Sequence, residues 1–539
     1  MRQPIRPVAA WAATAAMSAL LLAACGGGGD NGPGQATGGK GGAGAEGAAK
    51  TAAPSRSTWS PLRSLPLVPA AMSNLPDGKV MMWSAEEKFS FGAATGRTYF
   101  ATYDPATNTV TERTVTETGH NMFCPGTTNL PDGRLLVNGG ISSGATSLFN
   151  PATNTWSSGP AMNIARGYQA NTLLKDGTVL TLGGSWSGGV GNKHGEVWSP
   201  AGGWQRKTGI GIDSFLSPDP SRNFGGDSHF MLLPAGNGRV FHAGPGINMH
   251  WIGTEGAGSV QRAGPRGDDE FSISGTTVMY EQGRILKVGG GPGYDSVNAN
   301  ANSYVIDING PVTVRKLAPM AYRRAFHNAV VLPNGQVLIV GGQTYAVGFS
   351  DNNSVLVPEL FDPATETFTP LPPIAAPRNY HSVALLLPDA RVVSAGGGLC
   401  GAGCAANHPD LQVWTPHYLL NEDGSPATRP VIQNAPTSTG YGRTMTVTTD
   451  SAIASFAMVR LSSTTHTVNN DQRRLALTFR ATGTNTWAVD VPSNPGWALP
   501  GDWMLFAMNA DGTPSVAKIV RLTLDGAPQF AAVDDQTTT

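Results

Sequence analysis

The sequence predicts an all-β protein, a seven-bladed β-propeller followed by a small Ig-like β-sandwich. Glycine and proline account for 69 and 40 of the 539 residues, which suits a chain with many turns. Long helical periodicity is absent after the first 25 residues, and one hairpin phrase recurs through most of the chain. Together these observations favour many short strands over helices.

The N-terminal residues 1–25 have the form of a lipoprotein signal peptide. Arg2 and Arg6 precede an apolar run that ends in Leu-Ala-Ala-Cys at Cys25. This ending resembles the bacterial lipobox, which implies cleavage before Cys25 and lipidation of that cysteine. A plain signal peptide or a transmembrane helix is the alternative, although the apolar run is short for a membrane span.

Residues 26–57 read as a Gly-rich flexible tether with a root-mean-square reach of about 30 Å. Gly26 stands where the known inner-membrane retention signal would place an aspartate. We therefore expect an exported protein that is lipid-anchored in a bacterial cell envelope, in the outer rather than the inner membrane.

A repeated hairpin phrase fills residues 58–430. It appears as "LPDGKVMMW" from 75 and as "LPDGRLLVNGG" from 130, and its turn residues are Gly78, Gly133, Gly177, Gly238, Gly283, Gly335 and Ala390. Each unit reads as strand, Asp-Gly hairpin, strand, Gly-Gly and further strands. Seven such units indicate a propeller and resemble kelch repeats. A β-solenoid or a tandem of sandwiches fits the period less well.

After residue 430 the repeat stops, and alternating segments are separated by short turns. These segments are "TMTVTT", "ASFAMVRLS", "RRLALTFRA", "TWAVDVP", "DWMLFAMN" and "AKIVRLTL". They predict a small antiparallel Ig-like sandwich over 431–526, with a disordered tail at 527–539.

The four cysteines fall into separate classes. Cys400 and Cys404 share the Gly-rich segment "GGGLCGAGCAANH", and an exported chain favours a local disulfide there. A metal-binding pair is the alternative, but no second pair at zinc spacing is visible. Since Cys25 has its own explanation, Cys124 in "NMFCPG" remains single, which is unusual in an exported protein.

A count along the repeat places Cys124 among chemically interesting residues. Cys124, Tyr168, Phe326 and His381 each precede their turn residue by nine positions, and Tyr380 precedes its own by ten. We therefore expect them at the start of equivalent strands, near the channel axis. Each alone is more often a packed core residue, but their coincidence at one repeat position favours a site.

At these residues the sequence resembles galactose oxidase and its copper-radical oxidase relatives. The resemblance runs from about Trp59 to Leu524. It includes "HNMFCPG", "ARGYQ", "GGSWSGGVGNKHGEV", "RRAFHNAVVLPNG", "RNYHSVALLLPDA", "GGGLCG" and "STTHTVNNDQRR".

The resemblance implies one copper ion. Tyr168 would be the equatorial ligand and Tyr380 the axial ligand, while His381 and His466 would supply two nitrogen ligands. Imidazole and phenolate ligands with an open position suit Cu(II). The resemblance places His466 on a hairpin that reaches from the sandwich into the propeller.

The resemblance also implies a protein-derived cofactor, a thioether that joins Cys124 to Tyr168 and is shielded by Trp186. Oxidation of an alcohol to an aldehyde removes two electrons, of which copper accepts one and the modified tyrosine the other. Tyr380 would take the alcohol proton and Tyr168 a hydrogen atom from carbon, and dioxygen would leave as hydrogen peroxide. No nicotinamide or flavin is required, and no dinucleotide fingerprint appears.

Substrate choice is where the sequence departs from the family. Phe91 and Phe349 match aromatic residues of the family's pocket, and Tyr294-Asp295 replaces a tyrosine-glutamine pair. Gly225 stands where galactose oxidase carries an arginine that holds sugar hydroxyls. Because charge-assisted contacts are lost, we expect galactose itself to be a poor substrate. Another primary alcohol, a glycan terminus or a small aldehyde is favoured.

The alternative hypotheses belong to other functional classes. A kelch propeller could serve as a glycan or protein docking module, and loss of a copper or thioether residue would favour that reading. A nucleophilic role for Cys124 lacks a His-Asn or His-Asp partner set. The formal net charge of −1 and the scattered charges give nucleic-acid binding no support. We expect a monomer, and assign no role to His229 and His327, which have family counterparts near the site.

Overall fold

The computed structural model describes residues 53–93, 95–219 and 225–525. The predicted signal, the predicted lipidation site Cys25, most of the predicted tether and the tail at 527–539 lie outside these ranges. Within them the regular elements are strands and short 3-10 turns. The turns are η1 (Pro54–Arg56), η2 (Asp213–Phe215), η3 (Gly225–Asp227) and η4 (His417–Leu419). No helix found there is long and apolar enough to cross a membrane.

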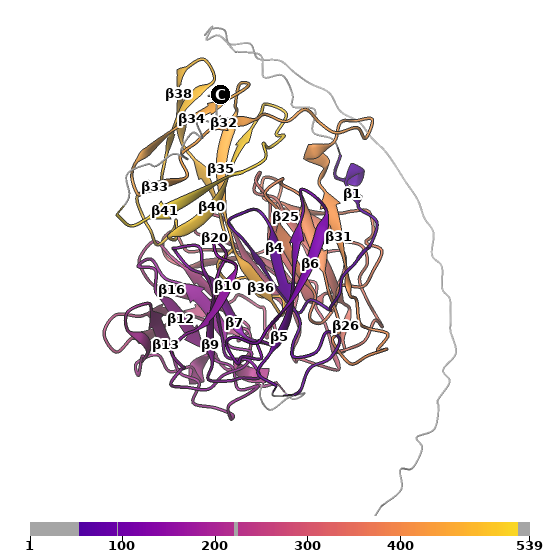
Figure 1. Ribbon diagram of the computed structural model, residues 1–539, viewed down its shortest axis with the longest axis vertical. Helices are drawn as coiled ribbons and strands as arrows, with labels where there is room; N and C mark the ends of the chain where they lie inside the picture. The colour runs from indigo at the N-terminus through magenta and orange to yellow at the C-terminus, as the bar shows by residue number, and fades with distance from the viewer. Residues whose placement is uncertain (1–52, 94, 220–224, 526–539) are drawn as a thin grey trace, which may run out of the picture. The chain divides into compact units, whose positions relative to one another are not determined.

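The repeated hairpins form seven antiparallel blades in the described part of the chain, which confirms the predicted propeller (Figure 1). Blade 1 contains β3 (Ala71–Asn74), β4 (Val80–Trp83), β5 (Thr98–Asp104) and β6 (Thr109–Val115). Blade 2 contains β7 (Gly126–Asn129), β8 (Leu135–Asn138), β9 (Thr146–Asn150) and β10 (Thr155–Ser158). Blade 3 contains β11 (Ala170–Leu173), β12 (Val179–Leu182), β13 (Glu196–Ser199) and β14 (Gly203–Arg206).

The next three blades continue the pattern in chain order. Blade 4 contains β15 (Met231–Pro234), β16 (Val240–Gly244), β17 (Asn248–Gly253) and β18 (Ser259–Pro265). Blade 5 contains β19 (Thr276–Glu281), β20 (Arg284–Val288), β22 (Ser303–Asp307) and β23 (Thr313–Lys316). Blade 6 contains β24 (Ala325–Val331), β25 (Val337–Gln343), β27 (Glu359–Asp362) and β28 (Thr367–Pro370). The short strands β21 (Val297–Asn298) and β26 (Tyr345–Ala346) pair between blades 5 and 6.

The last blade closes the ring with the N-terminal strands. Blade 7 contains β29 (Val383–Leu386), β30 (Val392–Ala395) and β31 (Asp410–Thr415). Its outer edge is completed by β1 (Thr58–Trp59) and β2 (Arg63–Ser64), which both pair with β31. Joining the first strands to the last blade removes a free sheet edge.

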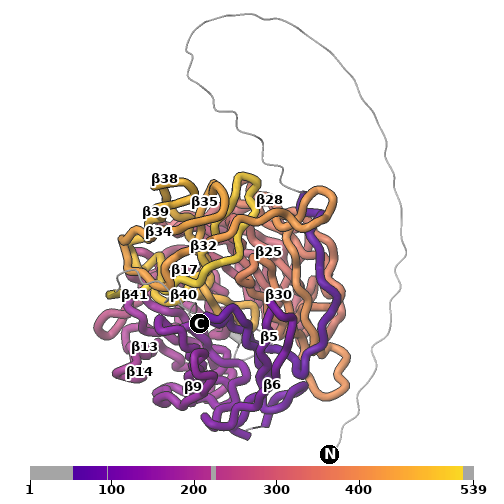
Figure 2. The backbone as a smooth tube through the Cα atoms, turned by 45° about the horizontal axis from the view of Figure 1, so that its top comes forward, coloured from indigo at the N-terminus to yellow at the C-terminus, as the bar shows by residue number. Residues whose placement is uncertain are grey.

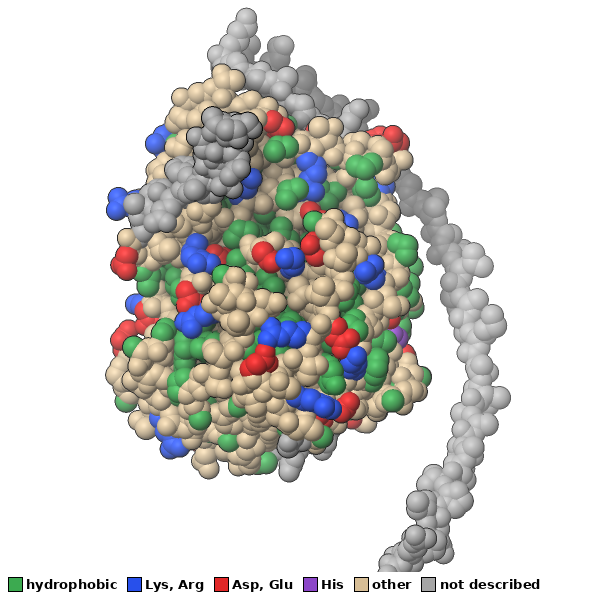
Figure 3. All heavy atoms as spheres, viewed as in Figure 1, with side chains coloured by type: hydrophobic (Ala, Val, Ile, Leu, Met, Phe, Trp, Pro, Cys, Tyr) green, Lys and Arg blue, Asp and Glu red, His purple; other side chains and the backbone are tan. Residues whose placement is uncertain are grey.

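Burial follows the position of each strand in its blade. The innermost strands β3, β11 and β15 are buried at every residue, whereas the outer strand β6 is largely exposed. Inner strands of neighbouring blades contact one another around the axis. The residues just before these inner strands therefore meet at one end of the channel. On the outside, Figure 3 shows basic and acidic side chains interspersed over the face in view.

The C-terminal sandwich packs two sheets around its own apolar core, and Figure 2 shows β32, β34, β35, β38 and β39 grouped together. One sheet contains β32 (Ile432–Asn434), β34 (Thr444–Thr449), β39 (Thr486–Asp490) and β38 (Phe479–Gly483). The other contains β33 (Ser438–Gly440), β41 (Lys518–Thr523), β40 (Gly501–Met508), β35 (Ser455–Arg460) and β37 (Arg474–Leu477). The sandwich confirms the predicted fold class.

Two details of the predicted sandwich are wrong. The segment "RRLALTFRA" is two strands, because β37 ends at Leu477 and β38 begins at Phe479 in the opposite sheet. A fully antiparallel arrangement is also wrong, since β33 pairs in parallel with β41. Alternation alone shows neither a change of sheet nor a strand direction.

A hairpin from the sandwich enters the propeller. Its strand β36 (Ser463–Thr465), labelled in Figure 1, pairs with β3 and contacts both β29 and β7, so it lies against the inner strands of blades 7, 1 and 2. Polar side chains that follow it satisfy the inner edges of other blades. Asn470 bonds Asn171 O at 2.9 Å, Phe230 O at 3.2 Å and Leu232 N at 2.9 Å. The hairpin thus fixes where residues 463–472 lie relative to several blades.

We expect Asn470→Ala to lower the free energy of unfolding by roughly 2–4 kcal/mol, because it leaves three buried backbone groups without a partner. Chemical denaturation followed by tryptophan fluorescence measures the change. Thr484→Ala, at an exposed position between β38 and β39, is the control and should change stability by less than about 0.5 kcal/mol. Equal stability of the two variants would show that the hydrogen bonds of the Asn470 side chain contribute little to the free energy of unfolding.

Candidate active site

A ring of residues with left-handed backbone lies just before the inner strands or, for Phe326, at the start of its strand. Its members are Cys124 (φ 59°), Tyr168 (φ 69°), His229 (φ 55°), Ser274 (φ 57°), Phe326 (φ 62°) and His381 (φ 71°). Non-glycine residues rarely adopt this conformation, and clusters of them are typical of functional sites. Tyr168 N donates to Cys124 O and His229 N donates to Tyr168 O, each at 3.0 Å, which links successive blades.

His229 and Ser274 are the ring members that the sequence reasoning left out. Both precede their turn residue by nine positions, at Gly238 and Gly283, so the count itself could have found them. His229 lies inside the aromatic cluster. Its ring is 4.6 Å from the Tyr168 ring and 4.7 Å from the His466 ring, between centroids.

The two tyrosines predicted to hold copper meet at their oxygens. The Tyr168 and Tyr380 hydroxyls are hydrogen-bonded to each other, although 212 residues separate them in sequence. The Tyr380 ring stacks on His381, with centroids 3.8 Å apart. Burial raises the pKa of Tyr168, so its phenol is protonated at neutral pH unless a cation stabilises the phenolate.

Both predicted histidine ligands use Nδ1 as a hydrogen-bond donor, which makes Nε2 the accepting nitrogen of each ring. His381 Nδ1 lies 2.6 Å from Gly398 O, and because a carbonyl only accepts, Nδ1 carries the proton. His466 Nδ1 lies 2.6 Å from Thr465 Oγ1, whose own proton goes to Ala70 O at 2.9 Å. Nδ1 of His466 must therefore donate as well. Hydrogen bonds of this kind orient metal-binding imidazoles.

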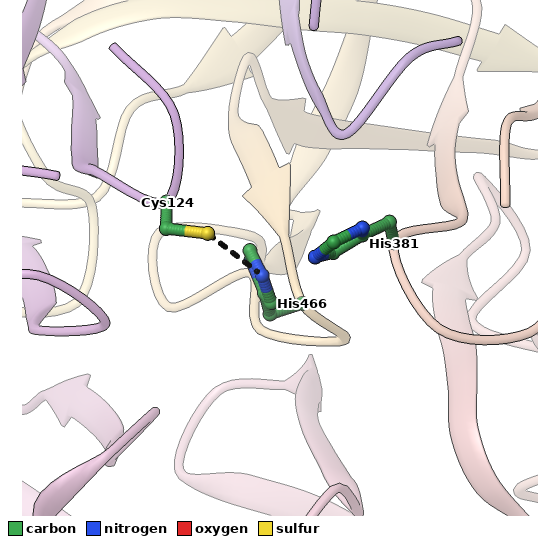
Figure 4. A group of neighbouring side chains, drawn as sticks. All are labelled: Cys124, His381 and His466. Atoms are coloured by element: carbon green, nitrogen blue, oxygen red, sulfur yellow. Dashed lines mark hydrogen bonds between the residues drawn. The ribbon is translucent and has the colours of Figure 1, made fainter. Parts of the chain in front are cut away.

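Cys124 is a buried cysteine that forms no disulfide, and its thiol lies among these donors. Its Sγ atom is 3.4 Å from His466 Nε2, as Figure 4 shows. Donor atoms of Cys124, His381 and His466 all lie within 4.8 Å of one another. Burial raises the pKa of the Cys124 thiol, while a side-chain hydrogen bond with Tyr168 opposes the shift. The sulfur is thus a neutral thiol beside the phenol.

Trp186 lies flat against Tyr168. The two rings are 4.9 Å apart between centroids and 5° from parallel. Phe91 stacks on Phe123 at 4.4 Å and lies 5.8 Å from Phe349, which is 5.1 Å from Tyr380. Aromatic side chains therefore enclose the donor atoms and limit contact of Tyr168 with water.

Tyr294 and Asp295 differ in their surroundings. Tyr294 is buried, stacks near Tyr168 at 5.9 Å and bonds His229 Nε2 through its hydroxyl at 3.3 Å. Asp295 Oδ1 accepts from Ser296 N at 3.0 Å and from Gly348 N at 3.2 Å. Asp295 thus supports the segment that carries Phe349.

The remaining cysteines of the described chain are paired. Cys400 and Cys404 form a disulfide, so their sulfur atoms are not a metal-binding pair. The disulfide closes the loop after Gly398, whose carbonyl holds His381. Asn407 Oδ1 accepts from Leu399 N at 2.6 Å and from Cys400 N at 3.0 Å within the same loop.

The donor set fits copper. The His381 and His466 rings lie beside the two hydrogen-bonded phenols, with centroids 3.8 Å apart for His381 and Tyr380 and 4.7 Å apart for His466 and Tyr168. Imidazole and phenolate are ligands that suit Cu(II). Burial, with neighbouring His229 and His381, lowers the pKa of His466 well below its ordinary value, so this ring is neutral and its lone pair is available at neutral pH. The same burial lowers the pKa of His229 to about 3.

Comparison with known proteins decides the family. The family model described as galactose oxidase-like, early set domain, matches residues 429–522, and the glyoxal oxidase N-terminus model matches residues 293–400. A galactose oxidase from Gibberella zeae is 42% identical over 484 residues, which cover 87% of this chain and 71% of that enzyme. The chain belongs to the galactose oxidase family.

Other relatives of the galactose oxidase family agree. An aldehyde oxidase GLOX from Vitis pseudoreticulata is 27% identical, with 75% of this chain and 82% of that protein covered. A solved fungal alcohol oxidase of the AA5 family, in complex with copper, matches with a TM-score of 0.84 and 41% identity. The match covers 87% of this chain and 100% of the solved chain. The protein is therefore a copper-dependent oxidase, and a purely docking propeller is not favoured.

Proposed function

We propose that this chain oxidises a primary alcohol, or a small aldehyde, with dioxygen and uses a thioether between Cys124 and Tyr168. The observation that carries the proposal is the convergence of Cys124, Tyr168, Tyr380 and two Nε2-accepting histidines under the Trp186 ring. The alcohol loses two electrons and two protons, and dioxygen takes both to give hydrogen peroxide. An aldehyde would be oxidised to the acid with the same balance, water supplying the extra oxygen.

Each residue has a defined task in this proposal. Tyr168, Tyr380, His381 and His466 would hold copper, which supplies one of the two electron-accepting groups. Tyr380 Oη would take the hydroxyl proton of the alcohol as a phenolate, and Tyr168 Oη would take a hydrogen atom from the carbinol carbon once dioxygen has removed one electron and the phenol proton from Tyr168. The hydrogen bond between the two hydroxyls places both acceptors beside one substrate.

The thioether explains why a thiol lies beside a phenol in a dry site. Its formation removes one hydrogen from Cys124 Sγ and one from a carbon of the Tyr168 ring. Dioxygen accepts these two electrons and two protons and leaves as hydrogen peroxide. Sulfur on the ring makes one-electron oxidation of the phenol easier, and the parallel Trp186 ring keeps water from the oxidised residue.

Galactose is not the preferred substrate in this proposal. Gly225 offers no side chain at the position where galactose oxidase carries its arginine, and Phe91, Phe349 and Trp186 line the approach to Tyr380 and Tyr168. Without the arginine at this position, a hexose loses charge-assisted contacts of about 1.5–3 kcal/mol each. A simple primary alcohol, a glycan terminus or a small aldehyde loses less.

The test is hydrogen peroxide release by the copper-loaded chain over a substrate panel. The panel contains galactose, an aliphatic and an aromatic primary alcohol, a glycan with a terminal primary alcohol and a small aldehyde. We expect release that depends on copper, with galactose well below the best substrate. Highest activity on galactose would refute the substrate proposal, and no release from any compound would favour a docking role.

We also propose export, lipidation at Cys25 and anchoring of a monomer in the bacterial envelope. Support comes from the lipobox-like segment alone, which lies outside the described residues. Cys25→Ala should release the protein from isolated membranes into the soluble fraction. A variant that stays in the membrane fraction would contradict lipid anchoring.

A further inference from the structure

A buried lysine holds the loop that carries Trp186. Lys193 is only 1% exposed, and its ammonium group donates to three backbone carbonyls. These are Ser187 O at 3.1 Å, Gly188 O at 2.9 Å and Ala165 O. An ammonium has three donors, so these carbonyls use all of them.

The three carbonyls belong to the two segments that position the aromatic stack. Ser187 and Gly188 directly follow Trp186, while Ala165 lies three residues before Tyr168. Lys193 therefore ties the segment of one ring to the segment of the other. Gly188 fits this arrangement, because a Cβ atom there would lie 2.4 Å from Ala165 Cβ.

The other side of Trp186 is held by a carboxylate. Asp227 accepts from Ser185 N at 2.9 Å and from Ser185 Oγ at 2.6 Å. Ser187 Oγ adds a bond to Gly140 O at 2.6 Å. Trp186 thus lies between a residue fixed by Asp227 and residues fixed by Lys193.

Lys193 and Asp227 add to other anchors of this loop. Among these, Trp186 N donates to Gly167 O at 3.3 Å, and Gly191 N donates to Ser185 Oγ at 2.9 Å. The loop lies between β12 and β13 and contains Gly188, Gly189 and Gly191, all with positive φ. Glycine gives such a loop many accessible conformations. Trp186 itself is only partly buried, so packing alone constrains its ring less than it constrains a core residue.

We propose that Lys193 is a positioning residue for the tyrosine cofactor: it holds Trp186 parallel to Tyr168 by binding the backbone on both sides of the stack. Only the effect of Lys193 on catalysis rests on the proposed function. The claim that Lys193 holds Trp186 parallel to Tyr168 applies to the protein without copper or a thioether.

The first experiment measures geometry in the copper-free protein. Crystal structures of Lys193→Met and Lys193→Arg are compared with the parent, and Lys207→Met is the control at a lysine that is not buried. We expect Lys193→Met to lose the parallel Trp186–Tyr168 stack. Lys193→Arg keeps hydrogen-bond donors at this position and should retain the stack at least in part. An unchanged stack in Lys193→Met would overturn the proposal.

A milder variant covers the case in which Lys193→Met does not fold. Ser185→Ala removes one of the two bonds to Asp227 and leaves Lys193 in place. If Trp186 depends on both anchors, its contribution to the near-ultraviolet circular dichroism, measured against Trp186→Phe, should shrink in the copper-free variant. An undiminished contribution would count against anchoring of the loop.

The second experiment uses the copper-loaded enzyme. We expect Lys193→Met to shorten the lifetime of the oxidised tyrosine, followed by its absorbance, and to lower kcat more than it changes KM. A purely structural lysine would lower the melting temperature and leave this lifetime unchanged, which would overturn the proposal. If the parent never shows the tyrosine absorbance, the proposed function fails, while the copper-free structures still test Lys193.

Discussion

Replacement of Cys124 by serine should lower kcat/KM for the best substrate by about a thousandfold, equivalent to roughly 4 kcal/mol of transition-state stabilisation. Serine nearly matches the size of cysteine but cannot form the carbon–sulfur bond to Tyr168. The unmodified phenol is harder to oxidise, so the second electron acceptor is largely lost. Steady-state kinetics with copper analysis on the same sample measure the effect, and copper content should stay near one per chain.

The matched control is Ser274→Ala. Ser274 occupies the same ring position in blade 5, with the same left-handed backbone, and its buried hydroxyl has no hydrogen-bond partner among the described residues. We expect its kcat/KM to stay within about threefold of the parent, since alanine removes no hydrogen bond there. If Cys124→Ser keeps activity within tenfold of the parent, sulfur has no essential role in the reaction.

Removal of His466 should have the second large effect. His466→Ala deletes one of two Nε2 donors, and copper affinity should fall by more than the roughly 10–100-fold expected when a residue that only orients a ligand is lost. Oxidase activity should fall below detection at micromolar copper. Titration of copper into the metal-free protein measures the affinity directly.

Thr465→Val provides the comparison. The Thr465 hydroxyl accepts a hydrogen bond from His466 Nδ1 at 2.6 Å. Its loss keeps the imidazole of His466 but removes the hydrogen bond that orients it. We expect copper affinity to fall about 10–100-fold. Copper binding by His466→Ala at the parent's affinity would contradict the proposal, because it would mean that His466 is not a copper ligand.

Much of the propeller was predictable because its information is local. Each blade repeats a tight hairpin turn between apolar strands, Asp-Gly in the first three blades, so turn residues such as Gly133 set both the period and the register. The same count places Cys124 and Tyr168 in neighbouring blades, and the hydrogen bond from Tyr168 N to Cys124 O shows that adjacency. The count also applies to His229, which precedes Gly238 by nine positions, but a lone histidine indicates no particular role.

His466 and Trp186 could not be found from the pattern. β36 pairs with β3, in a register that joins Thr465 to Ala71, although the two strands lie far apart in the sequence. Nothing near His466 in the sequence predicts this long-range pairing. Trp186 lies in a Gly-rich loop without periodicity, held by Lys193 and Asp227 through contacts that only the fold creates. For both, resemblance to a family supplied what residue spacing could not.

The break inside "RRLALTFRA" has a similar cause. The sequence alternates as a single strand would. However, the strand that ends at Leu477 belongs to one sheet, and the strand that begins at Phe479 belongs to the other. Packing of two sheets around one core decides where the chain crosses, and that choice is not encoded in alternation.

The most direct measurement is the intact mass of the chain after incubation with copper and dioxygen, followed by sequencing of the peptide that contains Cys124. The thioether predicts a mass two hydrogens below that expected from the Cys400–Cys404 disulfide alone, and a peptide joined to the one that contains Tyr168. A full-mass protein whose Cys124 still reacts with thiol reagents, in a preparation that oxidises alcohols, would contradict the proposed cofactor.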